Sequence, residues 1–298
     1  MKTTSKKIII ILNIALGIFI SFQAVKAVTV YPAIFEFNTT ADNKLADTLQ
    51  VYNESNVAIT IAADVENFIP KGESGEQNFI PGNYGLASWV SLSQKEISLN
   101  PGEKKSVSFK INLPQAPVPG AYSAGILWHE VRKPGEEVSV INRVGALVLL
   151  SIAGDSEIKA ELVEFSADKS FFEKLPVNFT VRIANKGNTL IKPVGEIIIK
   201  NIFGRTVDAL EINSFGNALL PESVRRFEAG WDSTSLAVGR YTAELNVKYG
   251  GEEKITANIK FWVLPWKQII VVAAGILLLA IIYAKTLGKI RRARRNRI

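Results

Sequence analysis

The sequence contains no cysteine and a single histidine, His129. Without thiols the chain can form no disulfide, no thiolate metal site and no lipid attachment through an N-terminal cysteine. One histidine cannot build a multi-histidine metal site, and a histidine flanked by Trp128 and Glu130 on an expected strand is most often structural. Stability must therefore come from packed cores alone.

Catalytic motifs are also lacking. No Gly-x-Ser-x-Gly elbow, phosphate-binding loop or His-Glu-x-x-His pattern is present, and the acidic residues are scattered along the chain. Asp64 and Glu66 share one face of an expected strand and could bind calcium, yet alternating acids on a solvated face are the more ordinary case. We predict a protein that is not an enzyme and that has no cofactor and no metal site.

The formal net charge of +7 belongs to the two ends of the chain. Residues 1–27 carry four lysines and residues 267–298 carry eight basic residues, with no acid in either stretch. Residues 28–266 therefore carry 7 − 12 = −5. A mildly acidic middle removes the main electrostatic argument for nucleic-acid binding.

The N-terminal residues 1–27 have the pattern of a secretory signal peptide. Three lysines in the first seven residues precede the weakly polar-to-apolar run from Ile8 to Phe22. Small or tolerated residues then stand where signal peptidase cuts, so cleavage after Ala27 would leave Val28 as the mature start. An uncleaved anchor helix is the alternative, because Lys26 is not ideal beside a cleavage site.

Near the C-terminus, Ile269 to Ala284 has no charge, with Trp266 and Tyr283 near its ends. This run predicts a transmembrane helix over residues 265–284 with interfacial aromatic residues. The basic tail, residues 285–298, fits the positive-inside rule and contact with anionic lipid. We expect a single-pass protein of the cell membrane with the bulk of the chain extracytoplasmic and the tail cytoplasmic. The Leu-Pro pair before the helix lacks the Thr-Gly that sortase attachment needs.

Between the two ends, short runs of alternating apolar residues recur, punctuated by Gly, Pro and Asn. Such runs predict strands with one buried and one wet face. The expected strands are 28–37, 46–53, 57–67, 89–99, 104–113, 120–131, 138–152, 157–167, 176–185, 190–200, 205–212, 222–230, 239–249 and 253–263. Seven and seven predict an all-β protein of two tandem immunoglobulin-like β-sandwiches, residues 28–154 and 155–264, plus the C-terminal transmembrane helix.

The two halves repeat three features in the same order. A strand ends in Asn53 in the first half and in Asn185 in the second, and each Asn begins a tight turn. A proline turn follows at Pro101 and Pro221, and then a glycine before a strand at Gly120 and Gly239. The proline and the glycine are 19 residues apart in one half and 18 in the other. This agreement favours a shared plan, with coincidence among common turn residues as the alternative.

The segment from Phe68 to Ser88 is the one long stretch that reads as irregular. It is rich in Gly and Pro, and Phe79, Tyr84 and then Trp89 lie in it or directly after it. Long loops in compact domains are often binding loops, and aromatic side chains there could stack on sugar rings or anchor a protein. These three residues are the predicted ligand-binding residues. The alternative is that they fold back onto the sandwich.

The segment from Ile97 to Leu127 combines a Leu-x-Pro-Gly turn, the strand Val107–Pro114 and the run Gly120–Ile126. With the overall plan, these motifs resemble the WxL-interacting proteins of bacterial surfaces. The resemblance implies that the first domain is peptidoglycan-binding-like. It also implies that the second domain, through Asn185–Asn188 and Pro193–Gly195, is a host- or partner-binding module.

Two functions remain open at this point. The first is a non-enzymatic, membrane-anchored surface protein that binds cell-wall glycan or a surface protein. The second is a structural subunit or chaperone of a membrane-associated surface assembly, with an edge strand or the transmembrane helix as its interface.

Overall fold

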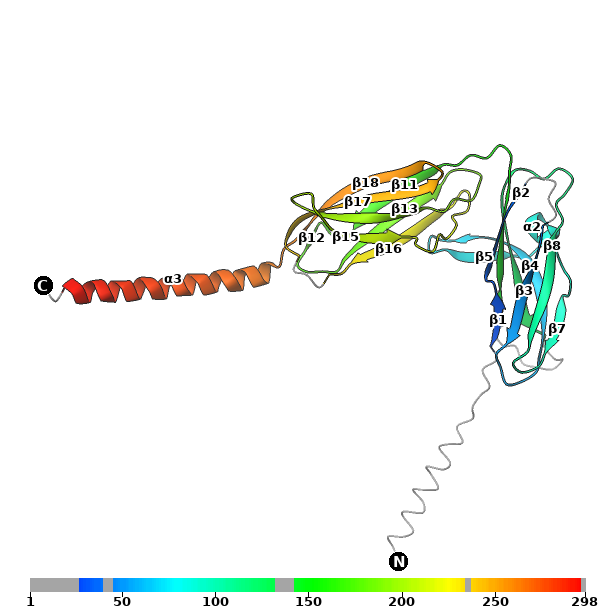
Figure 1. Ribbon diagram of the computed structural model, residues 1–298, viewed down its shortest axis with the longest axis horizontal. Helices are drawn as coiled ribbons and strands as arrows, with labels where there is room; N and C mark the ends of the chain where they lie inside the picture. The colour runs from blue at the N-terminus through cyan, green and yellow to red at the C-terminus, as the bar shows by residue number, and fades with distance from the viewer. Residues whose placement is uncertain (1–26, 40–44, 132–141, 234–236, 296–298) are drawn as a thin grey trace, which may run out of the picture. The chain divides into compact units, whose positions relative to one another are not determined.

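The computed structural model describes residues 27–39, 45–131, 142–233 and 237–295, and side chains up to Lys285. The predicted signal peptide lies almost wholly outside the described residues. The described chain consists mainly of β-strands followed by one long helix (Figure 1). It divides into two compact units. Unit 1 runs to Ala153 without residues 70–78, and unit 2 comprises Pro70–Asn78 and the chain from Gly154 onward.

Unit 1 contains two sheets that share one apolar core. The four-stranded sheet has the order β1-β3-β8-β6, and the other sheet has the order β2-β10-β9-β4-β5 with β7 beside β4. Its elements are β1 (Val28–Tyr31), β2 (Ile34–Thr39), β3 (Leu45–Asn53), β4 (Ile59–Lys71), β5 (Glu76–Ile80), α2 (Gly85–Trp89), β6 (Val90–Leu92), β7 (Glu96–Leu99), β8 (Lys104–Ile111), β9 (Gly120–Glu130) and β10 (Arg143–Ile152).

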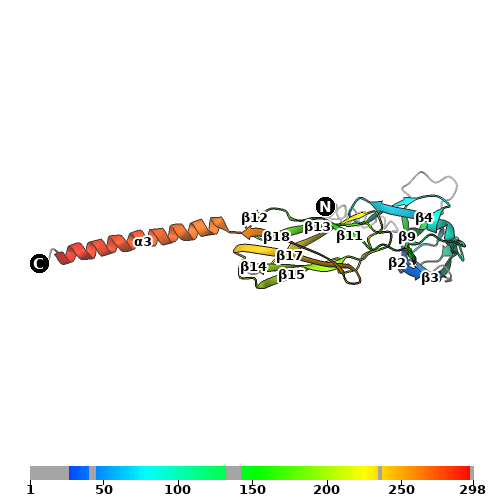
Figure 2. The same cartoon turned by 90° about the horizontal axis from the view of Figure 1, so that it is seen from above.

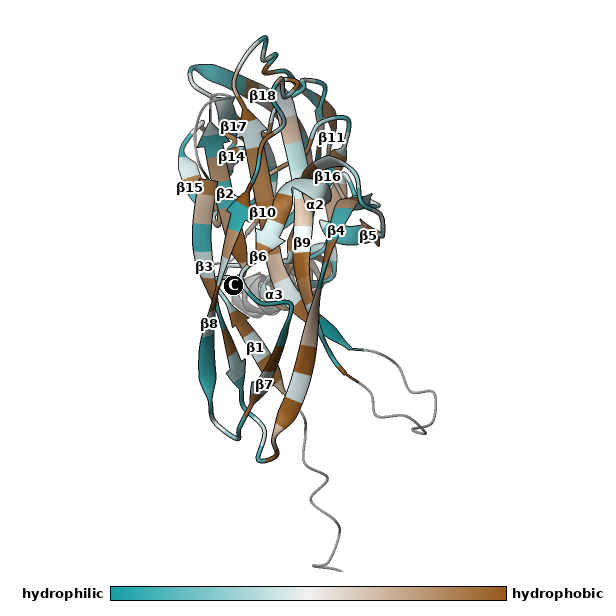
Figure 3. Ribbon diagram, turned by 90° about the vertical axis from the view of Figure 1, so that its right-hand side faces the viewer, coloured by the Kyte–Doolittle hydropathy of each residue, from teal (hydrophilic) through white to brown (hydrophobic). Residues whose placement is uncertain are grey.

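The predicted alternation of apolar residues is what builds this core. Along β8, Val107, Phe109 and Ile111 are buried while the residues between them are exposed. Facing them from the other sheet are Ile126, Trp128 and Leu150, each at most 1% exposed. Figure 3 shows the same alternation as bands of brown and teal along the strands. The two sheets therefore pack face to face through one side of each strand.

Two of the predicted strands are each divided in the structure. The expected strand 28–37 is broken at Pro32, so that β1 pairs with β3 in one sheet and β2 runs parallel to β10 in the other. The expected strand 89–99 is likewise divided into β6, which pairs with β8, and β7, which pairs with β4. A single strand cannot serve both sheets, so the chain crosses between them at these breaks.

The expectation of an irregular stretch from Phe68 to Ser88 was wrong. β4 continues to Lys71, a tight turn follows, and β5 returns along β4. Gly72 and Gly75 adopt positive φ values of 64° and 88°, which is the conformation that a tight turn requires and that glycine adopts without strain. The one-turn helix α2 comes after a second turn.

Unit 2 also has two sheets around one core (Figure 2). The sheet orders are β11-β13-β16 and β12-β18-β17-β14-β15. Its strands are β11 (Ala160–Ala167), β12 (Phe171–Phe172), β13 (Val177–Asn185), β14 (Val194–Asn201), β15 (Thr206–Ile212), β16 (Val224–Trp231), β17 (Gly239–Gly250) and β18 (Glu253–Val263).

The long helix α3 (Trp266–Arg295) follows β18 after two residues. Its first 20 residues, Trp266–Lys285, are long and apolar enough to cross a membrane, and none of this span is buried against the protein. The structure thus confirms an all-β chain with one apolar helix at its C-terminal end. The immunoglobulin-like plan of each sandwich and the orientation across a membrane stay predictions.

The repeated asparagine turn has the same geometry in both units. Asn53 and Asn185 are both fully buried. Asn53 Nδ2 donates to the carbonyl oxygens of Val57, Leu99 and Asn100, and Asn185 Nδ2 donates to those of Thr189 and Leu219. In each unit this buried amide ties the asparagine turn to the proline turn, which explains why the two features recur together.

The backbone around the two proline turns matches as well. The amide of Gly102 donates to the Asn53 carbonyl, and the amide of Glu222 donates to the Asn185 carbonyl. Both donors have positive φ, 70° for Gly102 and 55° for Glu222. The repeat read from the sequence therefore corresponds to one structural element used twice.

Candidate functional site

The outward face of the six-stranded sheet of unit 1 buries a second group of apolar side chains. Phe68, Leu127 and Leu149 point away from the core, yet each is at most 5% exposed. The ring of Phe79 covers this face: it lies 5.7 Å from the Phe68 ring, and a Cβ at Gly125 would stand 2.5 Å from it. The absence of a side chain at Gly125 thus lets the Phe79 ring approach the sheet closely. We call Phe68, Phe79, Leu127 and Leu149 the outer cluster.

An ion pair closes the outer cluster on one side. Arg143, at the start of β10, donates from Nη1 to Glu66 Oε1 at 2.7 Å, and its guanidinium carbon lies 5.9 Å from the centre of the Phe79 ring. Glu66 is only 7% exposed, and its Oε2 is buried with no hydrogen-bond partner among the described residues. Arg143 thus neutralises a nearly buried carboxylate while its guanidinium stacks on an aromatic ring.

The three predicted ligand-binding residues do not form one group. Phe79 belongs to the outer cluster. Trp89 packs against the core, with its ring 4.8 Å from that of Tyr122. Tyr84 is the exposed one of the three, at 51%, and its ring lies against Gly82.

Beside this segment lies an open hollow of about 520 Å³. Its lining includes the turn that precedes α2, the helix itself and the charged residues Asp64, Glu66 and Lys95. Among the described residues, no three histidine or acidic side chains gather into a group that could hold a metal ion. The hollow offers polar and charged groups of both signs next to the exposed ring of Tyr84, but none of the three predicted residues lines it.

The edge of β10 beside the outer cluster carries no described strand over its first four residues. β2 pairs with Leu147–Ile152 only, whereas β9 pairs with the whole of β10. Leu147 donates its amide to Ala33 on the β2 side. Because backbone groups alternate in direction along a strand, Gly145 and Arg143 also direct their N–H and C=O groups to that side. Residues Arg143–Ala146 therefore form an open sheet edge within the described part of unit 1.

The residues around this edge carry little charge. Beyond Arg143, the open edge contains only Val144, Gly145 and Ala146, and β1, at the edge of the other sheet, reads Val-Thr-Val-Tyr. Tyr31 and Ile34, between the two edges, are 70% and 45% exposed. Edges that avoid pairing with other chains usually carry charges, prolines or bulges. This edge has a single arginine, and that arginine is engaged by Glu66.

Three of the four edge strands described in unit 2 do show such protection, β12 being the exception. β11 has a bulge between Leu162 and Glu164, β16 carries Arg225, Arg226 and Glu228, and β15 carries Asp208 and Glu211. The open edge of β10 is therefore unlike these three edges of the second sandwich. Sequence reasoning missed Arg143 and this edge, because no local pattern shows that β2 ends its pairing at Leu147.

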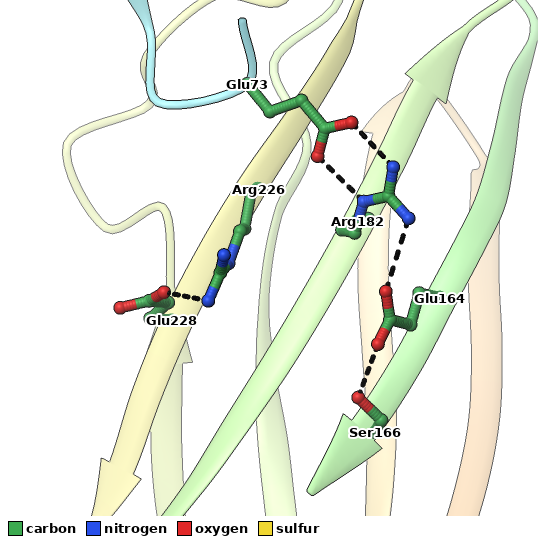
Figure 4. A network of polar contacts seen from close by, with 6 residues as sticks. All are labelled: Glu73, Glu164, Ser166, Arg182, Arg226 and Glu228. Carbon is green, nitrogen blue, oxygen red and sulfur yellow. Dashed lines mark hydrogen bonds and ion pairs between the residues drawn. The ribbon is translucent and has the colours of Figure 1, made fainter. Parts of the chain in front are cut away.

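A second polar group lies on β13 of unit 2 and includes the hairpin tip at residues 70–78 (Figure 4). Arg182 donates from Nη2 and Nε to the two carboxylate oxygens of Glu73, at 2.6 and 2.7 Å, and from Nη1 to Glu164 at 3.3 Å. The amide of Arg226 donates to the Glu73 carbonyl. This two-pronged ion pair fixes the tip of the hairpin on the sheet.

The charges of this network set its pH dependence. The hydrogen bonds from Arg182 lower the pKa of Glu73, and those from Ser166 and Arg182 lower the pKa of Glu164. A lowered pKa in the folded protein stabilises the fold above the unfolded carboxyl's pKa, roughly 4.3, and this contribution is lost as the pH falls through the folded value. We expect the melting temperature of unit 2 in the wild-type chain to decrease as the pH is lowered below about 4.5.

The matched control is Arg182→Met, which removes the charge that lowers both pKa values. In this variant the fall of the melting temperature with acid should be shallower than in the wild type, although the melting temperature at neutral pH is lower. Hydrogen exchange at the Arg226 amide should quicken in parallel. Equal pH profiles for the two chains would contradict the assignment.

Comparison with known proteins gives no family. No family model matches the chain, and no curated protein matches it. Among solved structures, the class 5 fimbriae chaperone CfaA is 16% identical and covers 80% of this chain and 100% of its own length, with a TM-score of 0.41. The E. coli chaperone DraB is 14% identical and covers 78% and 96%, with a TM-score of 0.36.

A third similar structure is a chain of the CsuC–CsuE chaperone–tip adhesion subunit complex from the archaic chaperone-usher Csu pili of Acinetobacter baumannii. It is 13% identical and covers 67% of this chain and 89% of its own, with a TM-score of 0.37. All three TM-scores are below 0.5, so these similarities assign neither a family nor a function.

Proposed function

We propose that this chain is a non-enzymatic, membrane-anchored surface protein that holds a protein partner by strand addition, as a structural subunit or chaperone of a surface assembly. The observation that supports it is the open edge of β10 at Arg143–Ala146. Strand addition uses main-chain hydrogen bonds for affinity and side-chain pockets for specificity. Arg143 and Gly145 each offer one N–H and one C=O to an incoming strand.

The surroundings of the edge define the chemistry of the partner. Tyr31 and Ile34 are exposed apolar residues on the route along which β2 would otherwise extend. Because the edge and its neighbourhood are largely uncharged, the partner segment should be extended, with apolar side chains at alternate positions. A charged segment would lose its hydration without gaining an ion pair.

A membrane anchor at α3 would hold this activity beside a membrane. The first 20 residues of α3, Trp266–Lys285, have the length and composition of a membrane span, and the basic residues at and beyond the end of that span favour a cytoplasmic C-terminus. With the signal peptide, this gives an extracytoplasmic pair of β-domains and a cytoplasmic tail in contact with anionic lipid. The partner would then be a surface protein held close to the outer face.

Site-specific photo-crosslinking in membranes of the native host tests the proposal. A photoreactive residue in place of Tyr31 lies beside the open edge, and one in place of Val207 lies on the protected edge strand β15, where Val207 is 46% exposed. We expect a discrete adduct with one protein from position 31 and none from position 207. Adducts of equal yield at both positions, or no adduct at position 31, would refute strand addition at this edge.

A pair of variants then asks whether the backbone of β10 makes the contact. Both variants are made in a Glu66→Gln background. Arg143→Pro removes the backbone N–H that faces the open edge, whereas Arg143→Ala removes the same side chain and keeps that N–H. The proline variant should bind the partner protein about tenfold more weakly than the alanine variant, because it lacks one main-chain hydrogen bond and its ring crowds the incoming strand. The two variants should behave alike if the partner contacts side chains only.

A second candidate function rests on the hollow beside Tyr84. Its polar lining and the neighbouring exposed ring suit a sugar, and the resemblance to WxL-interacting proteins points to cell-wall glycan as that ligand. Purified wall material should then sediment the full chain from detergent solution, and Tyr84→Ala should reduce the bound fraction. If the wild type does not sediment, this second candidate fails and strand addition is unaffected.

A further inference from the structure

One end of the strands of unit 2 adjoins α3, and the strand register identifies it. Gly239, at the start of β17, pairs with Val263, at the end of β18, and Asn201, at the end of β14, pairs with Tyr241. The end of β18, the start of β17 and the turn from β14 to β15 therefore lie at the same end of the sheet. α3 begins at Trp266, three residues after β18 ends.

The turn between β14 and β15 presents two apolar side chains at this end. Phe203 is 83% exposed and Ile202 is 59% exposed. The turn is held by Asn201, whose side-chain oxygen accepts hydrogen bonds from the amides of Phe203 and Arg205. This ordered turn holds Phe203 in an exposed position, and no described residue of unit 2 covers it.

Two further aromatic residues lie side by side at the same end. Phe171 of β12 pairs with Trp262 of β18, and they are 47% and 45% exposed. Val238, directly before β17, and Trp266, at the start of α3, are each 45% exposed. We call these six residues the helix-proximal rim: Phe171, Ile202, Phe203, Val238, Trp262 and Trp266.

The charge around the rim differs from that of the rest of the extracytoplasmic chain. The segments at this end, residues 168–176, 200–205, 232–240 and 260–267, contain seven basic and three acidic residues, a net charge of +4. The segments at the opposite end of the unit, residues 155–159, 186–196, 211–225 and 248–254, contain six basic and seven acidic residues, a net charge of −1. Aromatic and basic residues together are the composition of surfaces that lie in the head-group layer of a membrane.

The connection from β18 to α3 is short, and a hydrogen bond and an ion pair hold it against the chain at β12. The Leu264 amide donates to the Phe172 carbonyl, and Lys267 Nζ lies 3.0 Å from a carboxylate oxygen of Glu173. Three residues of chain can span at most about 10 Å. If α3 spans the bilayer from Trp266, the rim lies within reach of the head groups, whose layer extends about 5–8 Å beyond the hydrocarbon on each side.

We propose that the helix-proximal rim rests in the lipid head-group layer of the outer leaflet, with Phe203 and Ile202 inserted at its inner boundary. The occupant of this exposed apolar surface is thus the bilayer itself, preferably one rich in anionic lipid. The contact rests on the membrane anchoring given under the proposed function, and it goes beyond that function because it fixes how the second sandwich stands on the membrane. The contact would restrict the orientation of unit 2 on the membrane, so that the unit does not swing freely about its connection to α3.

Because the chain contains no cysteine, a single labelled cysteine can report its depth. Phe203→Cys carries an environment-sensitive fluorophore in the full chain, reconstituted in vesicles that contain lipids with a quencher on the head group or high on the acyl chain. The matched control is Phe215→Cys. Phe215 is 93% exposed and lies in the loop after β15, at the opposite end of the same hairpin. Flotation of the vesicles measures anchoring independently.

We expect both labelled chains to float, the probe at position 203 to lose most of its fluorescence to the lipid quencher, and the probe at 215 to lose none. Quenching at 203 should be greater in vesicles with anionic lipid than in zwitterionic ones. If both chains float and the two positions are quenched alike, the rim does not contact the membrane and anchoring stands. If neither chain floats, anchoring fails and the rim proposal fails with it.

Discussion

Replacing Asn185 by alanine is expected to lower the free energy of unfolding of unit 2 by about 3 kcal/mol, because its buried polar partners each lose a hydrogen bond and the side chain leaves a gap in the core. The Thr189 carbonyl oxygen would lose this donor, the Leu219 carbonyl oxygen would keep only the Ile191 amide, and the Gly187 amide would keep only the Lys159 carbonyl at 3.2 Å. Each unsatisfied group costs about 1–3 kcal/mol, and some of this is recovered when water enters. Asn53→Ala should act in the same way on unit 1.

The two variants should act independently, each on its own unit. Hydrogen exchange followed by mass spectrometry resolves peptides from the two units in the full chain, so that Asn185→Ala should speed exchange in β13 and β16 and leave β3 and β8 unchanged. Asn246→Ala is the control, because Asn246 lies exposed on β17 and its replacement should cost less than about 0.5 kcal/mol. If Asn185→Ala lowers the free energy of unfolding as little as the control does, the buried amide is not what joins the two turns.

The sequence patterns anticipated the strands well and the side-chain contacts poorly. Period-two alternation located β3, β8, β13, β17 and β18 to within about two residues, since these strands bury one face in the core. The position of Asn53 in a turn was also read correctly. Its burial was not, because the amide reaches Leu99, which lies 46 residues further along the chain. Local patterns carry no information about such distant partners.

The segment after Phe68 shows the opposite error. Its glycines and prolines read as a loop, yet Gly72 and Gly75 make a hairpin turn and allow β5 to return beside β4. The alternation rule also placed Glu66 on a wet face. The outward face of the sheet is covered there by Phe79, and a strand pattern alone does not show what lies over a sheet. The predicted aromatic residue thus proved to be a cover for the sheet, and the neighbouring edge of β10 went unnoticed.

The ion pair between Arg143 and Glu66, beside that cover, should be the next most sensitive point of the fold. Arg143→Ala would leave Glu66, 7% exposed, without its partner at 2.7 Å. An uncompensated charge in a fully buried pair costs about 3–5 kcal/mol. Arg143 itself is 35% exposed, so water can reach the carboxylate in the variant. We therefore expect unit 1 to lose about 2 kcal/mol of unfolding free energy, measured by denaturant titration.

The double variant Glu66→Gln, Arg143→Met separates the charge from the packing. It removes both charges and keeps the volume over Phe79, so it should recover all but about 1 kcal/mol of the loss. If the double variant is as unstable as Arg143→Ala, the arginine stabilises unit 1 through its stacking on Phe79 and not through Glu66. Recovery of stability in the double variant would show that the ion pair with Glu66 is what holds Arg143 in place beside the open edge. The Arg143 side chain would then lie over the outer cluster, and the backbone of β10 would stay free for a partner strand.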